Sequence, residues 1–322
     1  MISVVVPVYR NEANIPDLLA ALSGINAQLG GDLEVVLVVD GSPDRSYAVL
    51  REALPRQSFR SKLVLLSRNF GSFAAVRAGL AEASGEHLAV LAADLQEPPE
   101  LILRFRELLA AGDCDVVLAT RESRADPLLS RWSAGLFWWF YRKLVQPRMP
   151  PGGLDVFGCT RAFASHLLKL EEANSTLVGL LVWLGFRAKT IGYRRQARQV
   201  GKSAWTFARK WKYLSDSIFA FTDLPFRLLS FLGLVAVLCA TVISCAAIVS
   251  RLTGKIPVPG YTITVVLIMF FGGINAIGLA LLGAYLWRAF DNTKKRPNYL
   301  VVTSESFPAA PPPSRSSDVH AP

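Results

Sequence analysis

Short runs of β-branched and other apolar residues alternate with helical stretches up to about Ala119. Strands are predicted at Val4–Val8, Leu33–Val39, Lys62–Ser67, His87–Ala92 and Asp115–Ala119. Helices are predicted between them, at Ile15–Leu29, Ser46–Ala53, Phe73–Ala83 and Leu101–Ala111. Strands that are apolar throughout are typical of a parallel sheet covered on both faces. The alternation therefore predicts an α/β domain with a doubly wound, mostly parallel sheet.

Two long apolar windows without a charge follow in the C-terminal third. Leu228–Val249 and Tyr261–Leu286 have 22 and 26 residues, or about 33 and 39 Å as helices. Both exceed the ~30 Å hydrocarbon core of a bilayer, so both are predicted to span it. A pair of buried core helices is the alternative, which the length of the uncharged runs disfavours. The short connecting loop has fewer basic residues than the flanks, which predicts that both termini are cytoplasmic.

Further segments complete the predicted organisation. Residues 1–203 are predicted to form one domain, which is expected to stay in the cytoplasm because Met1–Pro7 has no signal-peptide pattern. Aromatic and basic residues occur together in 127–145 and 204–227, which predicts helices lying at the membrane surface; packing on the sheet is the alternative. A small-residue stripe in the second window favours a homo-oligomer through these helices, although plain helix composition explains it equally well. The Pro-rich tail, residues 303–322, is predicted to be disordered.

The amino-acid composition limits the classes of molecule that this chain is expected to bind. The chain has 35 Lys and Arg against 25 Asp and Glu, a net charge of +10, and is 52% hydrophobic. The hydrophobicity excludes a disordered chain. A basic balance beside apolar spans favours anionic lipid or a phosphorylated substrate, and the absence of a recognition motif disfavours nucleic acid. The four cysteines form no CxxC pair, so a disulfide scaffold is excluded.

Polar residues follow three of the predicted strands. Pro7-Val8-Tyr9-Arg10-Asn11-Glu12 lacks the Gly-rich turn of a dinucleotide site, and Asp40-Gly41-Ser42 is an acidic turn. Asp94-Leu95-Gln96 follows the strand His87–Ala92. An acid with a nearby amide oxygen at a strand end can hold Mg²⁺ or Mn²⁺. Each pattern alone could be a turn or a helix cap.

These motifs are more specific together, in their order along the chain, than any one of them is alone. Before the two predicted spans, the motifs occur in this order: Pro7-Val8-Tyr9 with Asn11-Glu12, Asp40-Gly41-Ser42, Ser67-Arg68-Asn69-Phe70-Gly71, the Asp94 motif, Asp155-Val-Phe-Gly158 and Gly201-Lys202-Ser203. The chain thereby resembles the family 2 glycosyltransferases that charge a polyprenyl phosphate, such as dolichol-phosphate mannosyltransferases, bactoprenol glucosyltransferases and the undecaprenyl-phosphate aminoarabinose transferase. The resemblance implies a GT-A fold, a UDP-linked nucleotide-sugar donor, Mg²⁺ or Mn²⁺, an undecaprenyl or dolichyl phosphate acceptor, and inversion at the sugar. It also implies a multi-pass protein of a bacterial-type plasma membrane.

The resemblance assigns roles residue by residue. It implies donor-nucleotide binding for Pro7, Tyr9, Glu12, Asp40, Ser42 and Arg68. It implies metal ligation for Asp94 and Gln96, and catalytic roles for Asp94 and Asp155. It implies donor and acceptor phosphate binding for Arg121, Arg124, Arg131, Arg195, Arg198 and Ser203. Arginine suits that task because it pairs with two phosphate oxygens at once.

Two acids of the family pattern are missing. The usual Asp-Asp-Gly-Ser turn has Val39 in its first position, and the usual Asp-Ala-Asp-Leu-Gln motif has Ala92 in its first position. Losing an acid beside a diphosphate-bound metal should weaken donor and metal binding. The replacements leave open a degenerate paralogue that binds nucleotide or lipid phosphate without turnover. A processive polysaccharide synthase is disfavoured, because the chain lacks the Gln-x-x-Arg-Trp acceptor motif.

Overall fold

The computed structural model describes residues 1–121, 141–143, 146–147, 149–150, 154, 156–172, 174–194, 207–253 and 260–311. The chain divides into two compact units. A sheet unit comprises Met1–Glu171, Thr176–Thr206 and Pro297–Pro322. A helical unit comprises Glu172–Ser175 and Phe207–Arg296.

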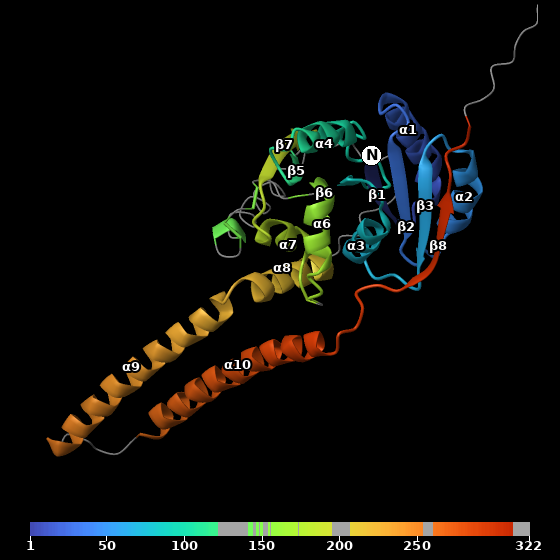
Figure 1. Ribbon diagram of the computed structural model, residues 1–322. Helices are drawn as coiled ribbons and strands as arrows, with labels where there is room; N and C mark the ends of the chain where they lie inside the picture. The colour runs from blue at the N-terminus through green and yellow to red at the C-terminus, as the bar shows by residue number, and fades with distance from the viewer. Residues whose placement is uncertain are drawn as a thin grey trace, which may run out of the picture. The chain divides into compact units, whose positions relative to one another are not determined.

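The sheet unit is built on eight strands (Figure 1). Their order is β7-β5-β6-β4-β1-β2-β3-β8. The central run β4-β1-β2-β3 is parallel, as is the β5–β7 pair, whereas β6 and β8 are antiparallel to their neighbours. The predicted mostly parallel α/β sheet is therefore confirmed. The strands are β1 (Ile2–Val8), β2 (Leu33–Val39), β3 (Arg60–Leu66), β4 (His87–Val90), β5 (Val116–Arg121), β6 (Val156–Thr160), β7 (Ala188–Tyr193) and β8 (Val301–Phe307).

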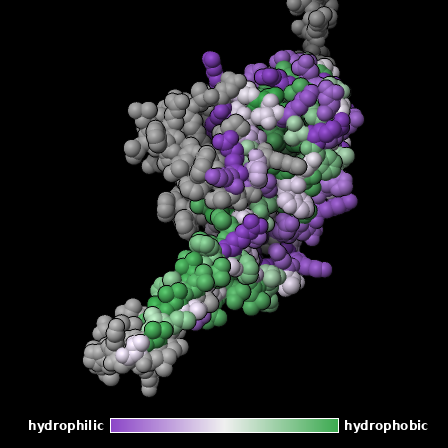
Figure 2. All heavy atoms as spheres, turned by 90° about the vertical axis from the view of Figure 1, so that its left-hand side faces the viewer, coloured by the Kyte–Doolittle hydropathy of each residue, from purple (hydrophilic) through white to green (hydrophobic). Residues whose placement is uncertain are grey.

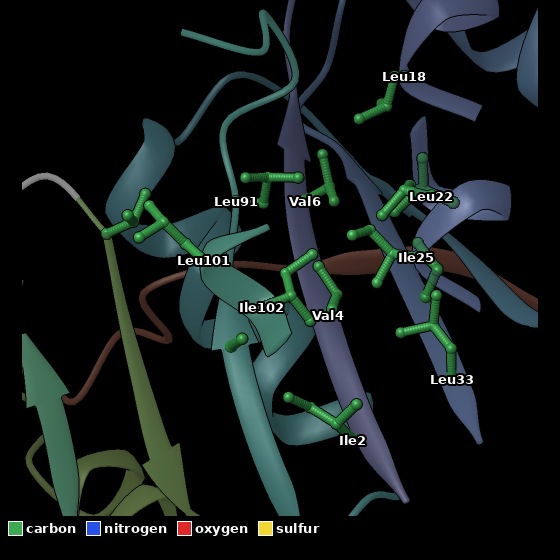
Figure 3. Packing of buried hydrophobic residues seen from close by; sticks show 14 of the residues in the cluster. Ile2, Val4, Val6, Leu18, Leu22, Ile25, Leu33, Leu91, Leu101 and Ile102 are labelled. Atoms are coloured by element: carbon green, nitrogen blue, oxygen red, sulfur yellow. The ribbon is translucent and has the colours of Figure 1, made fainter. Parts of the chain in front are cut away.

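Helices connect the strands and bury the sheet. β2 is buried at all seven positions, which explains why its sequence is apolar everywhere except at Glu34. Figure 3 shows Val4 and Val6 of β1 with Leu22 and Ile25 of the first helix, all in one buried cluster with Ile102. The helices of this unit are η1 (Glu12–Asn14), α1 (Ile15–Gln28), α2 (Ser46–Ala53), η2 (Leu54–Arg56), α3 (Ser72–Glu82), α4 (Leu101–Ala110), α6 (Arg161–Leu168) and α7 (Leu177–Trp183).

The helical unit contains α8 (Phe207–Phe221), α9 (Leu224–Leu252) and α10 (Tyr261–Thr293). α9 and α10 have 29 and 33 residues, about 44 and 50 Å at 1.5 Å per residue. Both helices are long and apolar enough to cross a membrane by length and composition, over Leu224–Ile243 and Phe270–Thr293. Large apolar side chains such as Leu279 and Leu286 are about 70% exposed. Figure 2 shows hydrophobic residues gathered over the described part of these helices.

The C-terminal prediction is wrong in part. Residues 303–307, expected in a disordered tail, belong to β8, which pairs antiparallel with β3 from Ser61 to Leu66. Apolar–polar alternation is absent from Val301–Phe307 because this edge strand is mostly exposed, so the sequence carried no strand signal. The compact unit that contains the sheet therefore includes residues beyond the predicted domain 1–203. The predicted surface segment 127–145 lies outside the described residues except for 141–143, which are helical.

Candidate active site at one edge of the sheet

The predicted site residues converge on one edge of the sheet because of strand direction. β1, β2, β3 and β4 run parallel, so the loops after them leave at the same edge. β6 runs opposite to both β4 and β5, so β5 and β7 also end at this edge and β6 begins there. Such edges bind ligands in open α/β sheets. The described residues Pro7, Tyr9, Glu12, Asp40, Ser42, Arg68, Asp94, Gln96 and Arg121 all lie at it.

The loops after β1 and β2 are joined by hydrogen bonds. The Arg10 N–H donates to Ser42 Oγ at 2.8 Å, and Ser42 Oγ donates to Asp44 Oδ1 at 2.6 Å. The Glu12 N–H donates to the other Asp44 oxygen at 3.2 Å, and the Glu12 carboxylate accepts the Arg45 N–H at 3.0 Å. Arg10 has a positive φ of 56°, an uncommon conformation for a residue with a side chain. These contacts fix the backbone beside Tyr9.

Asp40 connects the turn after β2 to the loop after β3. Its two carboxylate oxygens accept the N–H groups of Phe70 and Gly71 at 2.7 and 2.8 Å. Gly41 next to it has φ +54°, and a Cβ there would lie 2.3 Å from the Arg68 carbonyl carbon. Only glycine therefore allows the two loops to approach this closely. Asp40, predicted as a nucleotide ligand, thus orders the loop that presents Arg68, whose guanidinium lies 4.1 Å from the Phe70 ring centroid.

The two acids of this turn have opposite pKa shifts. Burial raises the pKa of Asp40, and the hydrogen bonds from Phe70 and Gly71 and the charge of Arg68 offset this only in part. Burial also raises the pKa of Asp44, but hydrogen bonds from Ser42, Ser46 and the Glu12 N–H outweigh it and leave the pKa below its usual value. Asp44 was absent from the predicted site, although its position two residues before a helix signalled an N-terminal turn.

The loop after β4 presents Asp94 and Gln96. Leu95 between them has φ +51° and packs its side chain against the core, and the Gln96 N–H donates to Asp94 Oδ1 at 3.4 Å. Asp94 is half-buried and Gln96 is buried. Among the described residues, no cluster of three or more His, Cys, Asp or Glu could hold a metal ion. One carboxylate and one amide fit Mg²⁺ or Mn²⁺ as a partial ligand set that substrate oxygens complete.

The same loop carries a buried acid that the prediction left out. Glu97 and Tyr193, at the end of β7, are 3% and 4% exposed, and the Tyr193 hydroxyl donates to Glu97 Oε1 at 3.5 Å. Arg121 is the register partner of Tyr193 on the neighbouring strand. The one sequence signal for Glu97 is its position close to Asp94, and a cap of the next helix explains that position equally well. The remaining predicted residues, Asp155, Arg124, Arg131, Arg195, Arg198 and Ser203, lie outside the described part of the chain.

Comparison with known proteins decides the family. The profile described as Glycosyl transferase family 2 matches residues 3–169, more than half of the 322 residues. The chain belongs to glycosyl transferase family 2. This family 2 glycosyltransferase is 33% identical to an uncharacterized glycosyltransferase of Synechocystis sp., over 93% of this chain and 94% of the relative. It is 32% identical to the putative glycosyltransferase CsbB of Bacillus subtilis, over 94% and 91%.

A third relative of this chain has a name that states its activity more specifically than the names of the first two. The prophage bactoprenol glucosyl transferase homolog of Escherichia coli is 31% identical, over 93% of this chain and 98% of the relative. Because these alignments cover more than nine-tenths of each chain, they include residues of the helical unit as well as of the sheet unit. The resemblance inferred from the ordered motifs is thereby confirmed at the level of family and enzyme class.

Proposed function

We propose that this family 2 glycosyltransferase moves a single sugar from a nucleotide-sugar donor, UDP-linked, to a polyprenyl phosphate. The observation that carries the proposal is the full-length similarity to proteins named bactoprenol glucosyl transferases, at 31% identity. Those names favour glucose as the sugar. The two long, exposed apolar helices α9 and α10 are consistent with an acceptor that resides in a membrane.

The donor would bind at the sheet edge described above. Tyr9 lies on the loop after β1, which hydrogen bonds to Ser42 and Asp44 hold in place. Arg68 lies on the loop after β3, which Asp40 holds in place. Both loops lie at the ends of the adjacent strands β1, β2 and β3. Arg68 is exposed and offers its guanidinium to a nucleotide diphosphate. The supporting residues would act mainly by fixing the backbone of these loops; they are Pro7, Glu12, Asp40 and Ser42. This division into presenting and supporting residues refines the predicted donor site.

Asp94 and Gln96 would hold the divalent ion. A bound Mg²⁺ or Mn²⁺ supplies charge neutralisation to the departing diphosphate. Arginine side chains of the protein would neutralise the remaining negative charge of the diphosphate, because a guanidinium can pair with two phosphate oxygens at once. Arg121 at the end of β5 is the described member of this group. Because Ala92 stands in the first position of this motif, Asp94 is its one carboxylate, and the proposed metal site would depend on it.

Positioning would dominate the chemistry. The acceptor phosphate is already anionic and needs little activation by a base. One of its oxygens forms a bond to the anomeric carbon while the bond from that carbon to the nucleotide diphosphate breaks, and the bonding electrons leave with the diphosphate. Attack from the opposite face inverts the anomeric centre. Asp155, which directly precedes β6, would orient the acceptor or the sugar. Positive-inside logic would place this chemistry in the cytoplasm, at a bacterial-type plasma membrane.

The test is transfer by the purified full-length protein in lipid nanodiscs. Undecaprenyl phosphate and Mg²⁺ are supplied with labelled UDP-glucose, and with UDP-galactose, GDP-mannose and UDP-N-acetylglucosamine in parallel. A lipid-linked sugar and released UDP in equal amounts are expected from UDP-glucose. Nucleotide binding without product from any donor would overturn the proposal and favour the degenerate paralogue that Val39 and Ala92 suggest.

A further inference from the structure

Glu97 joins the loop after β4 to a distant strand of the same sheet. It directly follows Gln96 in that loop, and its Oε1 accepts the hydrogen bond from the Tyr193 hydroxyl at 3.5 Å. Tyr193 is the last residue of β7. In the strand order, β6 and β5 lie between β4 and β7, which separates the two strands by about 14 Å. The loop after β4 therefore reaches along the edge of the sheet to its contact on β7.

The burial of this contact indicates placement more than cohesion. Both side chains are almost completely buried, and Tyr193 belongs to the same apolar cluster as Leu91 and Leu101, which lie at the two ends of the loop. An apolar side chain would fill this place without the cost of removing a carboxylate from water. A buried carboxylate instead needs a hydrogen-bond donor in a defined direction. The pair therefore specifies where the loop lies.

The backbone of the loop leaves that placement to the side chains. The Leu91 N–H still donates to a β1 carbonyl, at 3.0 Å. Further along, the Leu95 N–H donates to the Ala92 carbonyl at 3.4 Å, and the Leu101 N–H donates to the Pro98 carbonyl at 3.1 Å. These later bonds are local, so they shape the loop without joining it to another strand.

The two proposed metal ligands alternate with anchored side chains. Leu95 separates Asp94 from Gln96, has φ +51° and packs against the core cluster. A positive φ at a residue with a bulky side chain persists only where the surroundings hold it. Glu97, bound by Tyr193, is the anchor on the other side of Gln96. Each proposed ligand is thus next to an anchored residue, and Gln96 lies between two.

Tyr193 also connects this loop to the strand that carries Arg121. The two residues are register partners on the parallel strands β7 and β5, and neighbouring strands lie about 4.8 Å apart. The tyrosine that holds the metal loop is therefore adjacent to the arginine proposed to bind the donor diphosphate. We propose that Glu97 is a positioning residue: held by Tyr193, it fixes the metal ligands of its loop relative to Arg121. The inference rests on the proposed function and adds a residue to its metal site.

The experiment separates the hydrogen bond from the charge of Glu97 and from fold stability. Glu97→Gln keeps an acceptor without the charge, Glu97→Met removes both, and Tyr193→Phe removes only the donor. Tyr47→Phe is the matched control, because the Tyr47 hydroxyl donates to Glu305 Oε1 at 2.5 Å. That pair also joins a tyrosine to a glutamate of the sheet unit, and Glu305 lies on β8, at the opposite end of the strand order from β7.

The main measurement is metal binding without turnover. Full-length proteins in nanodiscs are titrated with Mn²⁺ in the presence of UDP and without a lipid acceptor, and bound Mn²⁺ is followed by electron paramagnetic resonance. UDP affinity without metal and Tm are measured on the same samples. Transfer from UDP-glucose to undecaprenyl phosphate then gives kcat and the Mg²⁺ concentration at half-maximal rate.

Tyr193→Phe and Glu97→Met are each expected to weaken Mn²⁺ binding about tenfold. The double variant should be no weaker than the more impaired single variant, because both remove the same interaction. Glu97→Gln should stay within about threefold of wild type, and UDP affinity without metal should change less than about twofold. Excess Mg²⁺ should restore most of kcat in all of them. Tyr47→Phe should bind Mn²⁺ like wild type.

Unchanged Mn²⁺ affinity in Tyr193→Phe would overturn the inference, and so would an equal loss in Tyr47→Phe. A loss confined to the two Glu97 variants would make the carboxylate itself a ligand and contradict a positioning role. Failure of the wild-type protein to bind Mn²⁺ with UDP would also overturn it. A wild-type protein that binds Mn²⁺ with UDP and transfers no sugar to the lipid would overturn the proposed function alone.

Discussion

At the residue scale, the proposed metal site depends on Asp94, because Asp94 is the one carboxylate of its motif. Asp94→Asn keeps the size of the side chain and removes the charge that a divalent ion needs. We expect it to lower transfer at limiting Mg²⁺ by about 100-fold or more. Glu100→Gln, an exposed acid six residues further on, is the control and should leave transfer unchanged. Wild-type turnover by Asp94→Asn would remove it from the site.

The converse substitution tests the missing acid. Ala92→Asp adds a carboxylate two residues before Asp94, where the family pattern has one. If the loop keeps the family's geometry, half-maximal activity should need about tenfold less Mg²⁺. The measurement is a Mg²⁺ titration of initial rate. An unchanged titration would mean that this loop positions its ligands differently, with the positive φ of Leu95 as the first feature to examine.

Glu34 illustrates a buried acid with a structural task. Burial raises its pKa, but hydrogen bonds from Ser3 and Ser84 and the charge of Lys62 outweigh this and lower the pKa below the usual 4.5. A carboxyl group whose pKa is lowered in the folded protein stabilises the fold at pH values above its usual pKa. This stabilisation is lost as the pH falls through the lowered pKa. Glu34→Gln should therefore cost about 1–3 kcal/mol at pH 7 and progressively less below pH 4.5.

Thermal unfolding in detergent measures this effect. The difference in Tm between wild type and Glu34→Gln should be largest near neutral pH and shrink on acidification. Glu52→Gln, at an exposed position of α2, serves as control and should show no difference at either pH. A Tm difference that grows as the pH falls would show that the carboxyl group is protonated in the folded protein.

At the scale of elements, β8 completes the sheet from far along the chain. It covers the edge of β3 in an antiparallel pair, and Glu305 accepts hydrogen bonds from Tyr47 and Arg51 of α2. An uncovered β3 would expose a row of backbone groups that favours aggregation. A strand after the last long helix therefore stabilises the end of the sheet that β2 and β3 form.

Two truncations test β8. A chain that stops after Asn298 loses the strand, and its Tm should fall by about 5 °C or more with earlier aggregation on heating. A chain that stops after Pro311 retains β8 and the hydrogen bond from the Ala310 N–H to the Gln57 carbonyl, and should unfold like wild type. Equal Tm values for the two chains would show that β8 contributes nothing to the sheet unit.

At the scale of the whole molecule, the two units cannot be separated by one cut. The chain passes between them at Glu171, Ser175, Thr206 and Arg296. A chain that ends at Asp223 would lose both long helices and β8 together. Replacing residues 224–296 by a flexible Gly-Ser linker removes α9 and α10 but keeps the strand that completes the sheet.

That linker variant tests the predicted surface segments 127–145 and 204–227. It should bind vesicles of phosphatidylglycerol at low salt and release them at high salt, since basic residues near anionic lipid contribute about 1 kcal/mol each. UDP binding should persist while lipid transfer falls. Vesicles of phosphatidylcholine are the control and should bind weakly. Indifference to both vesicle types at low salt would assign membrane anchoring to α9 and α10 alone.

The sequence by itself determined the local elements and the family. Mostly apolar runs identified β1 and β2, uncharged windows identified α9 and α10, and the ordered motifs identified the enzyme class, because each of these signals lies in neighbouring residues. Only the tertiary structure decided what distant segments do to one another. The pairing of β8 with β3, the hydrogen bonds from Phe70 and Gly71 to Asp40, and the contact of Arg288 with Asp216 and Asn174 join residues 30 to 246 positions apart. Such contacts depend on strand order and helix packing, which no local pattern encodes.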